Sequence, residues 1–374
     1  MGCRFEVLRT DPSGARLGRL ETPHGVVETP AFIPVGTAGS VKGLTQEQLE
    51  ELGAEILLAN TYHLYLRPGH DTIRQLGGLH QFMGWPRAIL TDSGGYQVFS
   101  MAALRRVTGE GVEFRSHVDG SLHFLTPEKA VEIQAALGSD VAMVLDECIE
   151  YPSSHEHARR AAQRTFHWAQ RSKQHFAAHG NAERQWLLAI VQGGTWPDLR
   201  RQNAAELVEL DLPGYAIGGL AVGEPHAITC EITALVTERL PAAKPRYLMG
   251  VGKPEDIPDY VALGVDLMDC VLPTRNARNG CLFTSNGRLL IKNARYARDS
   301  RPIDEACGCF VCRRYSRAYL RHLFVAGEML AATLHTYHNL FFYLGLLRRI
   351  RQAIRERRFA ALRAQLQAAA AEAY

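Results

Sequence analysis

Short apolar runs recur along most of the chain, and each is followed by a segment whose apolar positions have helical spacing. Strands buried on both faces appear as continuous apolar runs, and their regular alternation with helices is typical of a parallel sheet. Eight such strand–helix units predict the α/β class, as a (β/α)8 barrel of the TIM type. The eight runs are residues 31–35, 56–60, 88–92, 141–146, 187–192, 215–219, 246–250 and 265–269.

Three local signals predict where helices begin between these runs. Two of them have the spacing of a capping box, and the third places proline at the first helical position. The alanine- and glutamine-rich residues after 360 predict a further helix. The three predicted starts are Thr45 with Gln48, Ser153 with Glu156, and Thr126 before Pro127.

Three segments do not follow this alternation of strands and helices. Residues 1–29 alternate apolar and polar positions around turn signals, which predicts a small antiparallel sheet packed on the barrel. Two hairpin-like inserts follow, residues 107–125 with a turn near Asp119-Gly120, and residues 282–293 with a turn at Asn286-Gly287. We therefore expect three parts: the N-terminal sheet (1–29), a barrel core (30–280) and a C-terminal subdomain (281–374).

Composition adds little to this picture, but the distribution of charge adds more. The 374 residues are 46% hydrophobic and 22% charged, as in ordinary globular proteins, and the net charge is only +3. Between residues 313 and 363 there are eleven arginines and no lysine, which indicates a solvated helix face, a subunit contact or an anionic partner. Residues 1–20 are too polar for a signal peptide, and no apolar run approaches membrane-spanning length. We expect a cytoplasmic protein without a membrane partner.

Three of the eight cysteines lie close together, at Cys307, Cys309 and Cys312, and His338 follows them. In a chain that is expected in the cytoplasm, three cysteines so close together favour a bound metal over disulfides. Three thiolates and one imidazole complete a tetrahedral zinc shell with no open position, so we predict a structural Zn²⁺. His335 is the competing fourth ligand. We interpret the scattered cysteines as reduced thiols.

Two of the three aspartates that end apolar runs are candidates for catalysis, at the barrel end where reactive groups are usually displayed. Asp269 ends the eighth run, and Arg275 and Arg278 follow it. A carboxylate beside guanidinium groups suited to phosphates predicts chemistry on the sugar or base of a polyanion. Asp92 ends the third run, and Tyr96 nearby offers a flat face to a base. A tight turn capped by Asp92 is the alternative interpretation.

Other run ends suggest a site for the edge of a base. Asp146 and Gln192 end the fourth and fifth runs, and residues 218–223 could expose backbone amides after the sixth. A carboxylate and an amide match guanine, which presents N1–H and N2–H donors and an O6 acceptor. Any one of these groups alone is more often an ordinary strand-end hydrogen bond. Lys42 and Lys253 are further candidates for contacts with an RNA backbone.

Taken together, these stretches resemble the bacterial queuine tRNA-ribosyltransferases, a family also called tRNA-guanine transglycosylases. The resemblance runs in order over essentially the whole chain. It implies a zinc-bearing homodimer that replaces guanine at the anticodon wobble position of the tRNAs for Asp, Asn, His and Tyr. The incoming base is 7-aminomethyl-7-deazaguanine (preQ1), and the exchange is a step of queuosine biosynthesis. The matching stretches are residues 91–100, 146–148, 190–194, 218–223, 247–252 and 269–275, with the three cysteines and His338.

The resemblance also implies roles for individual residues. Asp269 is the nucleophile that forms a covalent ribosyl intermediate, and Asp92 is the general acid and base. Tyr96 and Met249 sandwich the base, and the Leu220 carbonyl meets the aminomethyl group of preQ1. The implied base pocket consists of Asp92, Ser93, Gly94, Gly95, Tyr96, Asp146, Cys148, Gln192, Gly219, Leu220, Val222 and Met249, of which Cys148 and Val222 favour preQ1 over the bulkier queuine. The implied RNA-binding residues are Lys42, Gly250, Val251, Gly252, Lys253, Pro254, Glu255, Asp256, Thr274, Arg275, Asn276, Ala277 and Arg278.

The implied chemistry agrees with the residues. Replacing a base with retained configuration requires two inversions, and a carboxylate nucleophile supplies the first. One acid/base residue can protonate the departing guanine and then deprotonate the incoming base. Two other classes remain open from the residues alone. One is an RNA-binding partner without chemistry, and the other is a metal-dependent barrel hydrolase, which would need metal ligands at the strand ends.

Overall fold

The computed structural model describes residues 2–101, 105–179 and 183–372. Its central sheet has eight strands, and every neighbouring pair within it is parallel. The last strand pairs with the first, and a parallel bridge between Val35 and Leu58 closes the ring. The predicted (β/α)8 barrel is thus confirmed. Its strands are β4 (Ala31–Ile33), β5 (Ile56–Ala59), β6 (Ala88–Thr91), β10 (Val141–Met143), β11 (Trp186–Val191), β12 (Tyr215–Ile217), β13 (Arg246–Leu248) and β14 (Leu267–Asp269).

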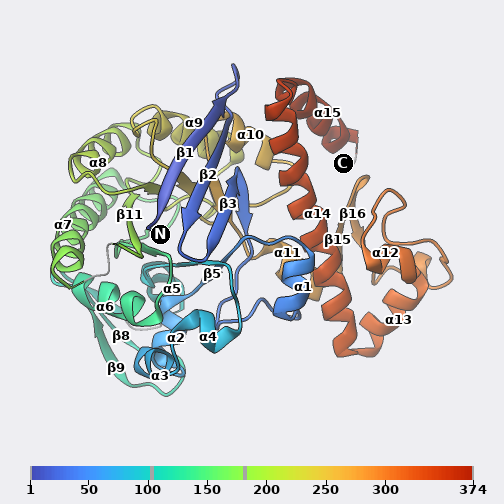
Figure 1. The fold of residues 1–374 in the computed structure, drawn as a ribbon, viewed down its shortest axis with the longest axis horizontal. Helices are drawn as coiled ribbons and strands as arrows, with labels where there is room; N and C mark the ends of the chain where they lie inside the picture. Colours follow the sequence, from blue (N-terminus) through green and yellow to red (C-terminus); the bar gives the residue numbers. More distant parts are fainter. Residues whose placement is uncertain (1, 102–104, 180–182, 373–374) are drawn as a thin grey trace.

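Helices follow the strands and form the outer layer of the barrel (Figure 1). The long helix α14 (Met329–Arg355) packs against α11 and β4, and so covers the place where the ring closes. The other helices of this layer are α1 (Gln46–Glu51), α2 (Thr61–Leu66), α3 (His70–Gln75), α4 (Leu79–Met83), α5 (Gly95–Met101), α6 (Pro127–Leu137), α7 (His155–His179), α8 (Pro197–Glu209), α9 (His226–Thr237), α10 (Ile257–Ala262) and α11 (Leu272–Arg278).

Two of the three predicted helix starts are confirmed. Thr45 forms a complete capping box at α1, and the Thr126 hydroxyl accepts the Lys129 N–H at the start of α6. The predicted cap at Ser153 is wrong by one residue. Helix α7 begins at His155, so the hydroxyl within reach of its free N–H groups is that of Ser154, which accepts the His157 N–H at 3.2 Å.

The N-terminal antiparallel sheet is confirmed as β1 (Arg4–Thr10), β2 (Arg16–Thr22) and β3 (Gly25–Thr29), which lie in front of the barrel in Figure 1. The first insert has three strands and not two: β7 (Arg105–Val107), β8 (Val112–Arg115) and β9 (Leu122–Leu125). The second insert is the hairpin of β15 (Cys281–Thr284) and β16 (Gly287–Leu290). Its turn residues are Ser285 and Asn286, one position earlier than predicted, because Gly287 already pairs with Thr284.

The C-terminal segment continues through a short 3-10 helix (Ala294–Tyr296), α12 (Phe310–Arg314), α13 (Arg317–Ala326) and, after α14, the predicted final helix α15 (Phe359–Glu372). Helix α15 packs against α10 of the barrel, and α14 also contacts β1 and β2. Because α14 joins this segment closely to the barrel, the three-part division of the chain stays a prediction. No helix in the described part of the chain is both long and apolar enough to cross a membrane.

A buried ion pair fixes the amino-terminal end of the barrel. The Arg16 guanidinium on β2 donates to both oxygens of Asp266, with Nε–Oδ1 and Nη2–Oδ2 distances of 3.1 and 2.8 Å. Both side chains are almost completely buried, and burial raises the pKa of Asp266 to about 6. The backbone N–H of Arg246 donates to the same carboxylate at 2.8 Å. The pair therefore joins the N-terminal sheet to β13 and β14, and β14 carries Asp269.

We predict that Arg16→Met lowers the free energy of unfolding at pH 7.5 by about 3–5 kcal/mol, because it leaves a buried carboxylate without its cation. The loss should shrink toward pH 4, since the unpaired Asp266 then becomes protonated. Urea unfolding measures both effects. The exposed Arg19 on the same strand is the matched control, and Arg19→Met should change stability by less than about 0.5 kcal/mol. Equal losses in the two variants would contradict the role of the pair.

Candidate active site and metal centre

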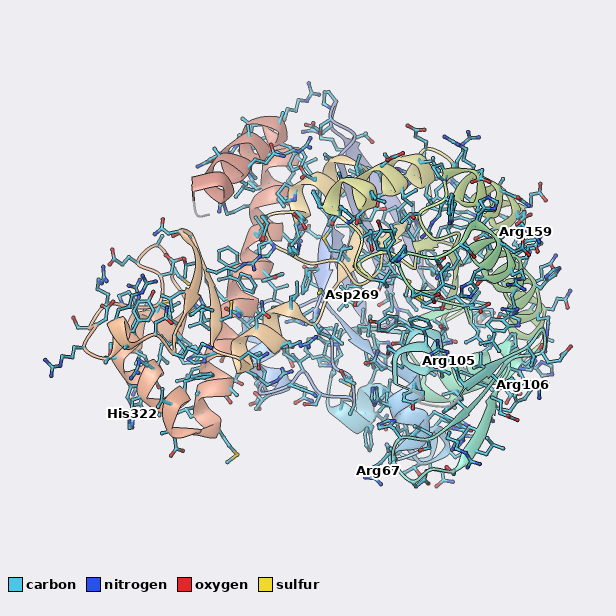
Figure 2. All side chains as sticks on the ribbon, turned by 180° about the vertical axis from the view of Figure 1, so that it is seen from behind. Arg67, Arg105, Arg106, Arg159, Asp269 and His322 are labelled. Atoms are coloured by element: carbon cyan, nitrogen blue, oxygen red, sulfur yellow. The ribbon has the colours of Figure 1, made fainter. Side chains whose placement is uncertain are left out.

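Several of the predicted site residues lie where barrel strands end. Asp92 follows β6, Gln192 follows β11, Met249 follows β13, and Asp269 is the last residue of β14. Because the strands are all parallel, these ends lie on one side of the barrel. Asp269 lies near the middle of the molecule in Figure 2, whereas Arg67 and Arg159 lie at its edge.

Asp92 is buried, and both of its carboxylate oxygens already accept hydrogen bonds. The Thr61 N–H donates to Oδ1 at 2.9 Å, and the Gln97 side chain donates to Oδ2 at 2.8 Å. The Asn60 amide also donates to Oδ2. Burial outweighs these donors and raises the pKa of Asp92 to about 7, with a smaller contribution from the charge of Asp269. A carboxyl group with a pKa near neutrality can act both as an acid and as a base.

Asp269 has a different environment. The Tyr247 hydroxyl donates to Oδ1 at 2.6 Å, and the Gly250 N–H donates to the same oxygen at 2.9 Å. No hydrogen bond in the described part of the chain reaches Oδ2. Burial raises the pKa of Asp269, while the two donors oppose that shift. One oxygen is thus fixed and the other is available, as a carboxylate nucleophile requires.

Asp146 and Gln192, two candidates for the base pocket, are joined by a hydrogen bond. The Ser93 hydroxyl donates to Oδ1 of Asp146 at 3.0 Å, and the Gln192 side-chain amide donates to Oδ2 at 2.7 Å. The side-chain oxygen of Gln192 is buried and has no hydrogen-bond partner among the described residues. Buried polar atoms are rarely left unpaired, so this oxygen is a candidate partner for a polar ligand. The backbone here is close: a Cβ at Gly95 would lie 2.5 Å from the Asp146 carbonyl oxygen.

The remaining candidates of the base pocket lie around this pair. Tyr96 is half exposed, with 50% of its surface accessible, and Met249 is partly exposed. Cys148 is buried, and burial raises the pKa of its thiol to about 12, so the thiol stays neutral. A cavity of about 320 Å³ begins at Gly95, Asp146 and Cys148 and extends toward α7. Of the other candidates, Gly94 and Leu220 are buried, and Gly219 and Val222 are partly exposed.

Several residues of this site were missed by the sequence analysis. Asn60, Thr61 and Gln97 hold Asp92, and Tyr247 holds Asp269. Glu224 accepts the N–H groups of Ala221 and Val222, at 2.5 and 3.0 Å. Asn60 ends the second apolar run, so the signal that identified Asp92 could have found it. No comparable signal distinguishes Tyr247, which lies inside a strand.

The predicted RNA-binding residues have three kinds of environment. Burial lowers the pKa of Arg278, and the nearby charge of Arg275 lowers it further. Both arginines are on α11, so this helix presents concentrated positive charge. Glu255 forms an ion pair with Arg288. Lys42, Gly250, Lys253 and Arg275 are exposed; Pro254, Glu255, Asp256, Asn276 and Arg278 are partly exposed; Val251, Gly252, Thr274 and Ala277 are buried.

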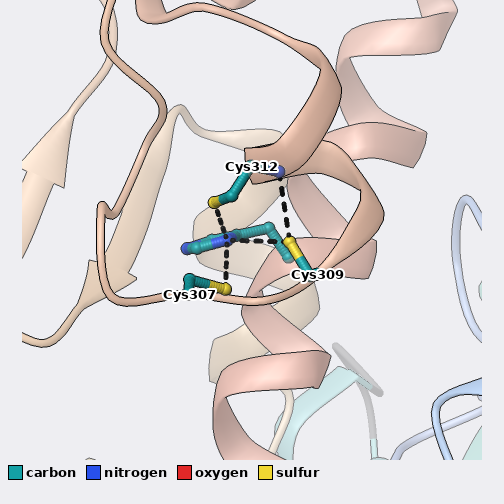
Figure 3. Close-up of side chains that lie close together, drawn as sticks. Cys307, Cys309 and Cys312 are labelled. Atoms are coloured by element: carbon teal, nitrogen blue, oxygen red, sulfur yellow. Dashed lines mark hydrogen bonds between the residues drawn. The ribbon is translucent and has the colours of Figure 1, made fainter.

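The three clustered cysteines surround one nitrogen of His338 (Figure 3). The distances from Nδ1 to the sulfur atoms of Cys307, Cys309 and Cys312 are 3.8, 3.6 and 3.4 Å. At usual zinc bond lengths, a tetrahedral site separates sulfur and nitrogen by about 3.6 Å, so these residues fit the ion. His338 Nε2 lies 2.8 Å from the Phe283 carbonyl, which favours the tautomer that leaves Nδ1 free for a metal.

His335, the competing ligand predicted from the sequence, lies outside this cluster. It is fully buried and not at the surface, and desolvation lowers its pKa to about 4. His335 and His338 are three residues apart on α14, and of the two rings only that of His338 contacts the thiols. The structure thus favours His338 as the fourth member of the cluster.

A second group of possible metal ligands consists of His24, His80 and Asp140. The two imidazole rings are stacked, with centroids 3.5 Å apart and planes within 15° of parallel. The nitrogen lone pairs of an imidazole lie in the plane of its ring, so those of two nearly parallel, stacked rings lie in separate planes and do not converge on one ion. Each ring instead contacts one oxygen of Asp140, at 2.7 and 3.2 Å, so we interpret the group as a hydrogen-bonded link. Asp140 precedes β10 and lies at the opposite end of the barrel from Asp92.

Comparison with known proteins agrees with this geometry. The model of one protein family, described as queuine tRNA-ribosyltransferase, matches residues 11–372. The chain belongs to the queuine tRNA-ribosyltransferase family. A queuine tRNA-ribosyltransferase of Caldanaerobacter subterraneus is 58% identical over 356 residues, which cover 95% of this chain and 94% of the relative. That of Desulforudis audaxviator is 56% identical over 370 residues, which cover 99% of each chain.

Membership of the queuine tRNA-ribosyltransferase family confirms the resemblance inferred from the sequence. It makes the chain a pentosyltransferase of tRNA-guanine transglycosylation in queuosine synthesis. The alternative of a metal-dependent hydrolase is therefore wrong. That class also requires metal ligands at the carboxyl ends of the strands, and neither group of possible ligands among the described residues lies there.

We predict that the purified protein carries about one zinc ion per chain, bound by the four residues of the cluster. Cys309→Ser should lose most of this zinc and melt at a lower temperature, because metal binding contributes to folding. Elemental analysis and circular dichroism measure the two effects. Cys230→Ser removes a thiol outside the cluster and should keep the zinc. Full zinc content in the Cys309 variant would exclude this ligand set.

Proposed function

We propose that this chain exchanges guanine at the wobble position of tRNA anticodons for preQ1, through a covalent bond between Asp269 and the ribose. The proposed substrates are the tRNAs for Asp, Asn, His and Tyr. The observation that carries the proposal is the contrast between the two carboxylates. Asp92 has both oxygens occupied and a pKa near neutrality, whereas Asp269 has one oxygen fixed and the other available.

In the first proposed step, Oδ2 of Asp269 attacks C1′ of the ribose. The bond between C1′ and the guanine nitrogen breaks, and the departing guanine takes a proton from Asp92. In the second step, preQ1 gives a proton to the Asp92 carboxylate and attacks C1′ from the opposite face, which releases Asp269. Two inversions retain the configuration of the sugar, and one glycosidic bond replaces another without any input from ATP.

The base is held by groups that match its edge. Asp146 accepts hydrogen bonds from the N1–H and N2–H donors of guanine, and Gln192 and the Gly219 N–H complete the recognition. Tyr96 and Met249 cover the two faces. Stacking on Tyr96 offsets part of the cost of taking the target base out of the anticodon stack. The Leu220 carbonyl accepts a hydrogen bond from the aminomethyl group of preQ1, while Cys148 and Val222 limit the space for larger substituents.

In the proposed complex, the protein binds the tRNA mainly through its phosphates. Lys42, Lys253, Arg275 and Arg278 contact the phosphates of the anticodon arm, which sets the register of the RNA and makes binding salt-dependent. The remaining predicted RNA-binding residues shape the surface beneath it. The Cys3His cluster holds a structural zinc ion. The protein works as a homodimer in the cytoplasm.

Exchange of radiolabelled guanine into unmodified tRNA, with preQ1 as competitor, tests this function. We predict that Asp269→Asn lowers the exchange rate at least about a thousandfold, because an amide cannot replace the carboxylate nucleophile. The variant should also form no tRNA–protein complex that resists denaturant. Asp198→Asn, at an exposed position on α8, is the matched control and should behave as wild type. A denaturant-resistant complex formed by the Asp269 variant would contradict the nucleophile assignment.

We also predict opposite pH dependences for the two half-reactions. Formation of the covalent complex needs protonated Asp92, so its rate should fall about tenfold per pH unit above about 7. Attack by preQ1 needs the Asp92 carboxylate, so that rate should fall below about 7. Single-turnover measurements between pH 5.5 and 8.5 separate the steps. If both rates changed in the same direction, Asp92 could not serve as both acid and base.

A further inference from the structure

Arg200 is a completely buried cation in the first turn of α8. Its guanidinium donates to the carbonyl oxygens of Gly194 and Val191, both at 2.7 Å, and to that of Gly218 at 2.8 Å. A longer contact of 3.5 Å reaches the Gly219 carbonyl. No ion pair in the described part of the chain includes Arg200. The hydrogen bonds of its guanidinium therefore all go to backbone carbonyl oxygens.

This position is costly for a cation. Burial removes the guanidinium from water and lowers its pKa to about 10. The free N–H groups at the start of α8 also disfavour positive charge there. An apolar side chain such as Met would fill the space without either cost. The contacts with the carbonyl groups must therefore have a role other than filling space.

The carbonyls that Arg200 holds belong to the two segments that end β11 and β12. Val191 and Gly194 lie on either side of Gln192, and Gly218 directly precedes Gly219. Helix α8 holds the first segment at a second point, because the Asn203 side-chain oxygen accepts the Gln192 N–H at 2.8 Å. The same helix thus supports both segments that face the candidate base.

Peptide geometry connects Arg200 to the Gly219 amide. In a trans peptide the C=O and N–H bonds point in opposite directions. Since the Gly218 carbonyl is directed at Arg200, the N–H of Gly219 points away from Arg200. No hydrogen bond between described residues uses that N–H. A Cβ at Gly219 would lie 2.3 Å from the unpaired Gln192 oxygen, and φ there is +64°, so this backbone conformation requires glycine.

We propose that Arg200 is a positioning residue for base recognition: it fixes the Gly219 amide and the Gln192 segment so that their polar groups meet the edge of a guanine-type base. This inference rests on the proposed function. Arg200 acts through the backbone and does not touch the base. It sets affinity for the free base, whereas the affinity for tRNA depends mainly on the phosphate contacts elsewhere.

Three variants test this role. Arg200→Met removes the donors at similar volume, Arg200→Lys keeps the charge without the planar fork, and Arg201→Met changes the exposed neighbour on the same helix. We expect Arg200→Met to raise the KM for free guanine about 10–100-fold, as for other small displacements of binding groups. Its Kd for tRNA should stay within about twofold of wild type. Arg200→Lys should be intermediate, and Arg201→Met should match wild type.

The outcomes separate the possible failures. A lower melting temperature and kcat with unchanged KM for guanine would show a purely structural role and overturn the proposal. If Arg200→Met does not fold, Arg200→Lys decides alone: a severalfold higher KM supports the role, and an unchanged KM rejects it. If the wild-type protein exchanges no guanine at all, the proposed function has failed instead, before any variant is compared.

Discussion

Closure of the parallel barrel is the constraint on which the rest of this structure depends. The pairing of β14 with β4 and the bridge from Val35 to Leu58 complete the ring, so residues far apart in the chain come to one rim. Asp92 and Asp269 are close enough there for one charge to raise the pKa of the other. Without closure, the two carboxylates and the segments that carry Gln192 and Gly219 after β11 and β12 would not lie at one end of the barrel.

Carboxylates are buried at both ends of the barrel, but their hydrogen-bond partners differ between the two ends. At the amino-terminal end, Arg16 and Asp266 neutralise each other and fix the base of β14. At the other end, Asp92 and Asp269 accept hydrogen bonds from neutral amide, backbone and hydroxyl donors instead of a cation. The cost of burying a carboxylate is thus offset by a cation at one end of the barrel and by neutral donors at the other.

Much of the fold could be predicted from the sequence because its signals are local. Each buried parallel strand gives an apolar run, and the caps at Thr45 and Thr126 are visible in a few residues. The errors were also local: the start at Ser154 and the turn at Ser285 differ from the prediction by one position. The three-stranded insert needed pairing information that the residues around Arg105 do not carry.

The site was only partly predictable for a related reason. Residues that directly follow a strand, such as Asp92 and Gln192, could be found by position, and their proposed roles came from the family resemblance. Residues whose role depends on their contacts in the folded chain could not be found by position. Tyr247 lies within a strand, and Arg200 looks like any arginine on an amphipathic helix until its carbonyl partners are known. His335 and His338 were both plausible ligands, and only the position of the thiols in the folded chain favours His338.

The central claim is that Asp269, and not Asp92, becomes bonded to the ribose. The most direct test is to denature the enzyme during turnover with tRNA, digest both protein and RNA, and locate the attached sugar by peptide mass spectrometry. The account predicts a ribosyl group on the peptide that contains Asp269 and none on the peptide that contains Asp92. A sugar on Asp92, or a complex with no covalent attachment under conditions of active exchange, would contradict it.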